Sequence, residues 1–480
     1  MAYNKEFVRK QMAETGSYKC AVCPYCNGTR DATIKYPERK PDPWTFWKKI
    51  GEPKYTVAPM VDQSELPFRM LCRRYGATLA YTPMFHSRSF AESAEYRRLQ
   101  FSTCAADRPL FVQFCGHDAD TVLGAARHVE NDCDAVDLNL GCPQGIARRG
   151  HYGSFLMEHW DTIHCIVHTL RVELACPVTV KMRRFDDMSL TLRYARMLRD
   201  AGAHLIAVHG RTRLQKGADT GLADLRFIKA VKEHITDVPV LENGNIVTFA
   251  DIAPNLAETK CDSAMSAEAL LWDPRLFSNP ARPVLTGRDY HCDKATRLDA
   301  LNTTMEYLDF VEQYPVDLGM VKAHMFKMMY HSFEVHVEFR NELGAFNCGS
   351  QLDAANEDAE RLTRGDVAAN DDGCGDGCKP EKAPGAAAGE PSSPTSAATD
   401  GSLKTTTSSK REEEMEVFRH KLAMLRSLVS RTIAAEQECT LEGSLPKQSA
   451  ASKKAEKAAQ PDVFDEVDTF DLGCLTAGTS

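Results

Sequence analysis

Eight short apolar runs alternate with segments of helical spacing between residues 54 and 280, and this alternation constrains the fold more than any other feature of the sequence. The runs cover residues 55–60, 78–82, 110–114, 135–140, 178–182, 205–209, 238–242 and 262–266. Apolar strands separated by helices are typical of a parallel sheet that helices cover. Eight such units predict a closed (β/α)8 TIM barrel over residues 54–280, with an open doubly wound α/β sheet as the alternative.

The rest of the chain divides into segments of different composition. Residues 1–53 form an N-terminal extension that is rich in lysine, proline and aromatic side chains. Residues 290–345 and 410–440 place apolar side chains at helical spacing and predict one small α-helical domain. Residues 349–409 and 443–480 carry few bulky apolar side chains, so we expect a disordered insertion and a disordered tail.

Composition narrows the class of protein. The net charge of −9 over 480 residues is no sign of a nucleic-acid binder, so any basic surface must be local. No apolar run approaches the ~20 residues of a membrane span, and the first 30 residues do not read as a targeting segment. The 17 cysteines then indicate reduced thiols. We expect a cytoplasmic or nuclear protein that has no membrane partner.

Three cysteines of the extension, Cys20, Cys23 and Cys26, repeat a C-x2-C spacing. Such spacing can place thiolates around zinc, but a structural zinc site takes four ligands. A fourth ligand is missing nearby, and Cys374 and Cys378 are distant candidates. The sequence therefore predicts no metal site, and the three cysteines are kept as zinc candidates.

Polar and reactive side chains stand where the predicted strands end. In a (β/α)8 barrel these carboxyl ends meet at one face, which carries the active site. Residues 137–143 read Asp-Leu-Asn-Leu-Gly-Cys-Pro, so glycine and proline end a buried strand and leave the thiol of Cys142 at the start of a loop, near the amide of Asn139. A lone cysteine is more often a small buried side chain, so its neighbours decide the interpretation. The other strand ends carry Ala58, Pro59, Met60, Gln113, Lys181, His209, Asn243, Gly244, Asn245, Ala267 and Glu268.

This set of side chains predicts a reaction centre with a bound cofactor. Lys181 can offset negative charge on a cofactor ring, and Gln113 can bond to the ring edge. The last two turns lie where such barrels bind phosphate through backbone amides.

Several motifs resemble those of the flavin-dependent tRNA-dihydrouridine synthases, and most closely the eukaryotic branch that acts on positions 16 and 17 of the tRNA D-loop. The motifs are Val-Ala-Pro-Met-Val-Asp at 57–62, Tyr-Thr-Pro-Met at 81–84, Gln-Phe at 113–114, Asp-Leu-Asn-Leu-Gly-Cys-Pro at 137–143, Arg-Gly-His-Tyr-Gly at 149–153, Val-His-Gly-Arg-Thr at 208–212 and Asn-Gly-Asn at 243–245. The resemblance covers residues 54–280 and, more loosely, the helical region.

The resemblance implies a cofactor, a reductant and a reaction. FMN would be held by the strand-end residues from Ala58 to Glu268 named above, and NADPH would reduce the flavin. Hydride would pass to carbon 6 of a uridine that has been extruded from the folded tRNA, while Cys142 protonates carbon 5 as general acid. The product would be 5,6-dihydrouridine in the D-loop, and Asn139 would read the polar edge of the base.

Basic residues beside the strand ends predict the surface that contacts tRNA. Arg148, Arg149 and His151 follow the cysteine turn, and Arg211 and Arg213 follow His209. Together with Arg183, Arg184 and Lys216 they would form a positive rim that binds phosphates, which Lys322, His324 and Lys327 of the helical domain would extend.

Two other functions stay open at this point. One is an FMN oxidoreductase that acts on a free pyrimidine, as a dihydroorotate dehydrogenase does; a small substrate needs neither the helical domain nor the basic loop. The other is a non-catalytic RNA-binding protein. Such a protein would not need Cys142, Lys181 and His209 together.

Overall fold

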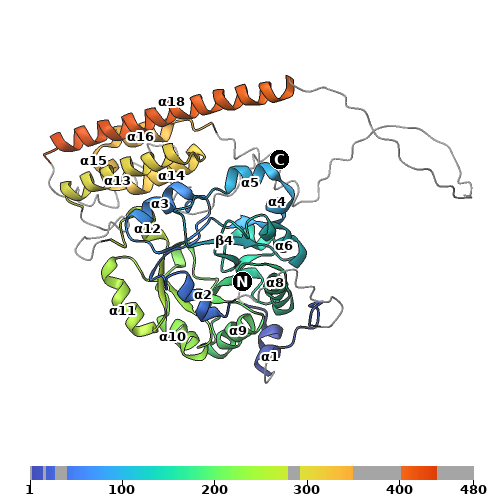
Figure 1. Cartoon of the computed structure of the whole chain (residues 1–480). Helices are drawn as coiled ribbons and strands as arrows, with labels where there is room; N and C mark the ends of the chain where they lie inside the picture. The colour runs from blue at the N-terminus through green and yellow to red at the C-terminus, as the bar shows by residue number, and fades with distance from the viewer. Residues whose placement is uncertain (1–2, 14–17, 27–40, 279–291, 350–401, 441–480) are drawn as a thin grey trace, which may run out of the picture.

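The computed structural model describes residues 3–13, 18–26, 41–278, 292–349 and 402–440, and its centre is a closed barrel of parallel strands (Figure 1). The barrel strands are β1 (Tyr55–Val57), β2 (Leu79–Tyr81), β4 (Leu110–Cys115), β5 (Ala135–Leu140), β6 (Val178–Arg183), β7 (Leu205–His209), β8 (Val240–Asn243) and β9 (Ser263–Ser266). Neighbours in this order pair in parallel, and β9 pairs with β1 to close the ring. The short strand β3 (Phe85–His86) pairs with β4. The predicted (β/α)8 barrel is confirmed over the open sheet.

Helices cover the outside of the barrel. They are α3 (Leu66–Arg74), α4 (Ser87–Glu92), α5 (Ala94–Gln100), α6 (Ala119–Arg127), α7 (Gly145–Arg149), α8 (Trp160–Glu173), α9 (Met188–Asp200), α10 (Leu225–His234), α11 (Phe249–Thr259) and α12 (Glu268–Trp272). Helix α9 shows why these segments are helical. The Asp187 carboxylate caps its first turn by accepting from the Leu190 N–H at 2.7 Å, and Leu190, Tyr194 and Leu198 recur every four residues on the buried face.

The amino end of the barrel is filled with apolar side chains. Phe46 and Trp47 of α2 (Pro43–Lys49) belong to one buried cluster with inward-facing residues of six strands, among them Leu79, Phe111 and Leu241. The Trp44 indole donates to the Thr236 carbonyl, just before β8, at 3.0 Å. Helix α2 is therefore the floor of the barrel. The first barrel strand begins at Tyr55, and the N-terminal extension supplies the floor beneath it.

A helical domain packs on α3 and α12, the helices that follow β1 and β9 (Figure 1). It consists of α13 (Lys294–Gln313), α14 (Leu318–Met328), α15 (Tyr330–Val335), α16 (Val337–Ala345) and the long α18 (Ser402–Glu438), which lies along α13 and α16. The two predicted helical segments thus form one unit. Helix α18 begins at Ser402, inside the segment that the sequence predicted to be disordered, because a helix anchored by Leu422, Leu425 and Val429 propagates beyond its packed part. Residues 350–401 and the predicted tail lie outside the described residues.

Three basic residues that the sequence placed on the tRNA rim instead join the helical domain to the barrel or to itself. His324 is fully buried, its Nε2 donates to the Glu65 carboxylate at 3.0 Å, and its ring stacks on the Phe68 ring at 4.3 Å. The Lys327 ammonium lies 4.5 Å above the Trp272 ring, and Lys322 donates to two backbone carbonyls, those of residues 344 and 346. The prediction that these residues extend an exposed rim is wrong for His324 and Lys327, which are buried, and Lys322 is half-buried with its ammonium bonded to the backbone.

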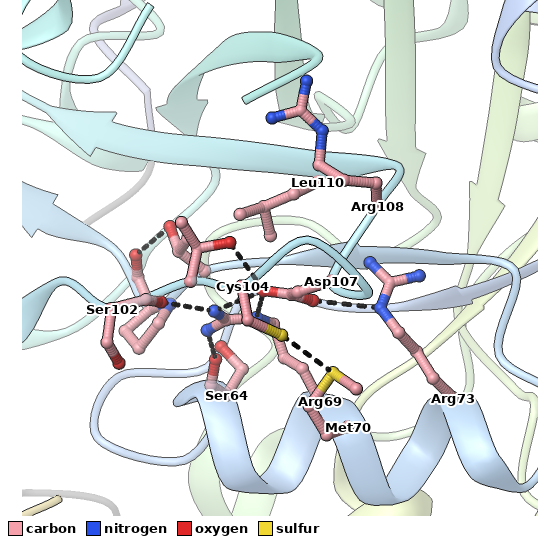
Figure 2. A network of polar contacts seen from close by, with 12 residues as sticks. Ser64, Arg69, Met70, Arg73, Ser102, Cys104, Asp107, Arg108 and Leu110 are labelled. Carbon is pink, nitrogen blue, oxygen red and sulfur yellow. Dashed lines mark hydrogen bonds and ion pairs between the residues drawn. The ribbon is translucent and has the colours of Figure 1, made fainter. Parts of the chain in front are cut away.

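A buried carboxylate fixes the turn that follows β1. Asp107 is fully buried and accepts hydrogen bonds from Arg69, at 2.7 and 2.9 Å, and from Arg73 at 2.9 Å (Figure 2). Arg69 also donates to the Ser64 carbonyl at 2.6 Å, and the Ser64 hydroxyl accepts from the Met60 N–H at 3.0 Å. Residues 58–60 are thus held from below by a charge network. Breaking a buried pair of this kind costs about 3–5 kcal/mol.

None of the described helices has the length and apolar character needed to cross a membrane.

Candidate active site

The mouth of the barrel, at the carboxyl ends of the strands, is lined by polar side chains. Alternate residues of a strand point to the same side, so Asp137 and Asn139 of β5 face inward together, as do Lys181 and Arg183 of β6. Strand pairing places Gln113 beside Asp137, Asn139 beside Lys181, and Arg183 beside His209. The side chains that the sequence predicted to act together therefore lie on adjoining strands.

The cysteine turn is held by the Asn139 amide. Its Oδ1 accepts the backbone N–H groups of Gly141, at 3.1 Å, and of Cys142, at 2.9 Å, while its Nδ2 donates to Gln113 Oε1 at 2.8 Å. Each end of the amide is thus used, and its orientation is fixed. The amide determines where the Cys142 backbone leaves the strand.

A buried carboxylate continues this network below the mouth. Asp137 accepts from Gln113 Nε2 at 2.8 Å and from the Thr179 hydroxyl at 2.6 Å. Burial raises the pKa of Asp137 to about 6, although these two bonds and the charge of Lys181 act in the opposite direction. The carboxylate orients Gln113, which in turn orients Asn139.

The second turn against Cys142 explains the Gly-His-Tyr-Gly motif. The backbone N–H and the hydroxyl of Ser154 both donate to the Cys142 carbonyl, at 3.0 and 2.9 Å. Gly153 has φ +64°, and a Cβ there would lie 2.8 Å from the Cys142 carbonyl oxygen and 3.0 Å from its Cβ. Only glycine fits this approach. The thiol is partly buried, and burial raises the pKa of Cys142 above its ordinary value of 9.0, so it is protonated at neutral pH.

Lys181 is the charged group at the mouth that has no partner. Its ammonium makes no hydrogen bond or ion pair with any residue that the structure describes, whereas most neighbouring basic side chains are paired. Burial, together with the charge of Arg183, lowers the pKa of Lys181 to about 8. The Lys181 side chain is half-buried, and an ammonium that is partly removed from water without an ion-pair partner is unfavourable, which indicates that an anionic group completes this site.

His209 is neutral and oriented. Burial and the nearby charges of Arg183, Lys181 and Arg211 hold its pKa well below 6.5. The Arg211 guanidinium lies 3.2 Å from His209 Nε2, and a guanidinium can only donate, so Nε2 accepts and the ring proton is on Nδ1. His209 therefore offers one N–H donor to a ligand.

The turn after β8 leaves backbone donors unused. Gly244 has φ +129°, and a Cβ there would lie 2.5 Å from the Ala223 side chain. The Asn245 side chain clamps the backbone of Ala223, accepting and donating at 2.8 Å each. The N–H groups of Gly244 and Asn245, and that of Ala267 after β9, donate to no described residue. These turns match a phosphate bound by backbone amides.

Comparison with known proteins agrees with this arrangement. A family model described as dihydrouridine synthase (Dus) matches residues 56–363, more than half of the chain. The chain belongs to the dihydrouridine synthase family.

Curated relatives place the chain within that family. A Schizosaccharomyces pombe protein named tRNA-dihydrouridine(16/17) synthase (NAD(P)(+)) is 45% identical over 306 residues, covering 62% of this chain and 74% of that protein. A Saccharomyces cerevisiae protein of the same name is 46% identical over 310 residues, covering 63% and 71%. A human protein named tRNA-dihydrouridine(20a/20b) synthase (NAD(P)+)-like is 34% identical over 244 residues, covering 50% and 75%.

The residues at the mouth fit the flavin that the family resemblance implies. The unpartnered ammonium of Lys181 suits the anionic part of a flavin ring, and the Nδ1–H of His209 suits its polar edge. The Gln113 amide is buried and bonded to Asp137 and Asn139, so it supports this edge from behind. The unused amides of residues 244, 245 and 267 suit its phosphate. Glu268 is exposed, and its negative charge interacts with that of Arg211. At this position the backbone N–H groups, and not a positively charged side chain, can therefore hold a phosphate.

The predicted tRNA-contacting residues separate into two groups. Arg148, Arg149 and His151 are exposed on α7 and the turn after it, and Arg211 is partly exposed. Arg213 is only 6% exposed, pairs with Glu158 at 3.0 Å and lies 4.3 Å below the Tyr3 ring. The structure thus gives Arg213 a place inside the protein, in contrast to the exposed place that the sequence suggested.

Arg183, which the sequence placed on the positive rim, is buried and bonded to the backbone, so that prediction is wrong for this residue. Its Nε donates to the Gly141 carbonyl at 2.8 Å, and its Nη1 donates to the carbonyls of Thr212, at 2.7 Å, and Gln215, at 3.1 Å. It therefore ties the cysteine turn to the loop after β7. The signal in the sequence was its position two residues after Lys181, on the same side of the strand.

Proposed function

We propose that this protein reduces uridine to 5,6-dihydrouridine at positions 16 and 17 of the tRNA D-loop, with FMN as cofactor and NAD(P)H as reductant. Family membership supports the reaction. The relatives named for positions 16 and 17 are 45–46% identical, against 34% for the human relative named for 20a and 20b, which supports the choice of position. The observation that carries the proposal is the protonated thiol of Cys142, fixed by Asn139 beside Lys181 and His209.

The cofactor would be held by residues of several strand ends. These are Ala58, Pro59, Met60, Gln113, Lys181, His209, Asn243, Gly244, Asn245, Ala267 and Glu268. When bound, FMN supplies hydride-transfer chemistry, and NAD(P)H restores its reduced form. The protein contributes position, charge and a proton.

Cys142 is the proton donor of the proposal. The thiol gives its proton to carbon 5 of the uracil as carbon 6 accepts hydride, so the carbon–carbon double bond is reduced and a thiolate is left. The Gln144 N–H and the charge of Arg183 favour that thiolate, since both lower the pKa of Cys142 against the effect of burial. Water can then restore the proton, because the side chain is partly exposed. Asn139 lies next to the thiol and would read the edge of the base.

The tRNA would dock on the mouth through Arg148, Arg149, His151 and Arg211. Lys216 is also exposed there, and its ammonium donates to the Pro143 carbonyl at 3.0 Å, so it supports the same turn. The helical domain would make a second contact with tRNA, because the family resemblance implies one. On that domain the Arg431 guanidinium pairs with Glu342.

The test uses purified full-length protein and tRNA transcripts that lack modifications. We expect flavin absorption in the protein and, with NADPH, dihydrouridine in the RNA, measured by mass spectrometry of the nucleosides. Transcripts with cytidine at 16, at 17 or at both positions would locate the product. Reduction of free uridine or orotate at a comparable rate would favour the free-pyrimidine function. Absence of flavin together with tRNA binding would favour a non-catalytic protein.

A further inference from the structure

The three N-terminal cysteines lie on the outer face of the barrel, against helix α8 and far along the chain from the active site. The Tyr18 hydroxyl donates to Asp161 at 2.6 Å, the Ala21 N–H donates to the same carboxylate at 3.1 Å, and the Tyr25 hydroxyl bonds to Glu173. These contacts hold residues 18–26 along about three turns of α8, from Asp161 to Glu173. The cysteines are therefore held against side chains of that helix.

The contact completes the ligand set that the sequence lacked. The Sγ atoms of Cys23 and Cys26 and a ring nitrogen of His164 all lie within 4.8 Å of one another. Cys23 is fully buried, and His164 is 6% exposed. His164 lies more than a hundred residues beyond the cysteines in sequence, so spacing alone does not reveal it.

His164 also has a buried nitrogen with nothing to bind. Its Nδ1 has no hydrogen-bond partner among the residues that the structure describes. This buried, unpartnered nitrogen can offer a lone pair to a ligand. A neutral imidazole is the form that binds metals.

Cys20 is the candidate for the fourth ligand, although its Sγ lies outside the group of three close atoms. This Sγ accepts the Cys23 N–H at 3.3 Å and donates to the Asp161 carbonyl at 3.6 Å. Cys165 also lies near the sulfurs, and it interacts with Cys23 and with the Thr169 hydroxyl. It directly follows His164 on the helix, so the two side chains leave α8 about 100° apart, as 3.6 residues per turn requires. Cys20 is therefore the better fourth ligand.

We propose that Cys20, Cys23, Cys26 and His164 bind one zinc ion. Three thiolates and one imidazole form the tetrahedral Cys3His set of structural zinc sites. The bound cation would deprotonate the three thiols, because the thiolate is the form that ligates metals.

A second group of close ligand atoms serves as a contrast. His336, Glu436 and Cys439 also lie within 4.8 Å of one another. There the Arg297 guanidinium pairs with Glu436 at 2.8 Å, and His336 bonds to the same carboxylate at 3.1 Å. A protein cation already occupies that site. The N-terminal cluster contains no such cation among its described neighbours.

Zinc at this position would fix the N-terminal segment to the barrel. The segment begins with Tyr3, whose hydroxyl donates to the Arg184 carbonyl at 3.3 Å and whose ring lies over Arg213. Helix α1 (Lys5–Ala13) follows and packs on α9. The metal would thus support, from outside, the loop after β7 that carries Arg211 and Arg213. The proposal does not depend on the proposed function.

The first experiment measures zinc in full-length protein purified without an affinity tag that binds metals. We expect about one zinc ion per chain, as a single four-ligand site requires. Cys20→Ser, Cys23→Ser, Cys26→Ser and His164→Ala should each lose most of the zinc, while Cys165→Ser, the matched control, should keep it. Wild-type protein without zinc after growth in zinc-supplemented medium would overturn the proposal, and so would full zinc in His164→Ala. Loss of zinc from Cys165→Ser with retention in Cys20→Ser would overturn this ligand set.

A second measurement uses only wild-type protein and covers the case that a variant fails to fold. Replacing zinc by cobalt should give thiolate-to-cobalt charge-transfer bands with the visible absorption of a tetrahedral site. Removing the metal with a chelator should expose residues 3–26 to protease while the barrel stays resistant. Absence of the bands, or a disulfide between two of the cysteines in freshly purified protein, would contradict the proposal.

Discussion

The two ends of the barrel are built from the same eight strands but are filled in opposite ways. At the amino end, Phe46 and Trp47 of α2 and the inward-facing residues of the strands form an apolar floor. At the carboxyl end, the inward-facing positions carry Asp137, Lys181 and His209, whose pKa values are all displaced by burial. The floor therefore stabilises the fold, while the mouth carries groups that burial makes unfavourable.

The position of a side chain along its strand therefore decides whether it contributes mainly to stability or to catalysis. An apolar side chain in the floor contributes through the area that it removes from water. A charged or reactive side chain in the mouth costs stability and is useful only with a ligand. Substitutions in the mouth should change activity with little change in stability, and substitutions in the floor should do the reverse.

The largest loss of activity without a loss of stability is expected for Cys142→Ala. Because general acid catalysis is worth about 10²–10⁴-fold, dihydrouridine formation should fall by that factor while flavin content and thermal stability stay as in wild type. The measurement is single-turnover reduction of a tRNA transcript, with Cys133→Ala, a buried cysteine that precedes β5, as the control. Turnover within a fewfold of wild type would remove Cys142 from the mechanism.

The opposite result is expected for Trp47→Ala in the floor. Removing a buried tryptophan should lower the free energy of unfolding by about 3–5 kcal/mol, while turnover per folded molecule at low temperature is kept. Urea unfolding followed by circular dichroism gives the first quantity. Lys48→Ala, an exposed position on the same helix, should change it by less than about 0.5 kcal/mol. A loss of turnover without a loss of stability would break the comparison.

Charge reversal at the mouth, with the same change at the floor as its control, tests which end of the barrel binds tRNA. Arg148→Glu with Arg149→Glu at the mouth should weaken tRNA binding and reduce the slope of log affinity against log salt by about 2, because two phosphates of the RNA are then no longer neutralised. Lys48→Glu with Lys49→Glu at the floor changes net charge equally and should leave both values unchanged. Equal effects of the two double variants would mean that tRNA responds to net charge alone.

The smallest expected effect is a pH dependence of flavin affinity. Lys181 has a pKa of about 8, so its charge is present below that value and is lost as pH rises through it. FMN affinity should therefore fall by up to tenfold per pH unit above about 8 in wild type, relative to Lys181→Met. In flavin-free protein the sign is opposite for stability: the lowered pKa makes the charged lysine destabilising, and this cost is relieved as pH rises from about 8 towards 10.5. If FMN affinity changes with pH in the same way in wild type and in Lys181→Met, this role of Lys181 is contradicted.

The sequence allowed the barrel and the chemical residues of its mouth to be predicted because both depend on local pattern. All eight strands were predicted by short apolar runs, and the position of Cys142 by the Gly-Cys-Pro turn. The partners of arginines could not be predicted. Arg149 and Arg213 look alike in sequence. Arg213, however, is buried by contacts with Glu158 and Tyr3, which are distant along the chain. The role of α2 was hidden because seven residues are too few to show a helical period.

The sealed floor has a kinetic consequence. Since Phe46 and Trp47 fill the amino end, a reductant and a nucleic acid must both reach the reacting atoms through the carboxyl end. The two substrates then exclude each other, and a catalytic cycle consists of two visits to one entrance, one after the other. Initial-rate plots at several fixed concentrations of tRNA should give parallel lines, and an excess of either substrate should slow the reaction by occupying the entrance in the wrong half of the cycle.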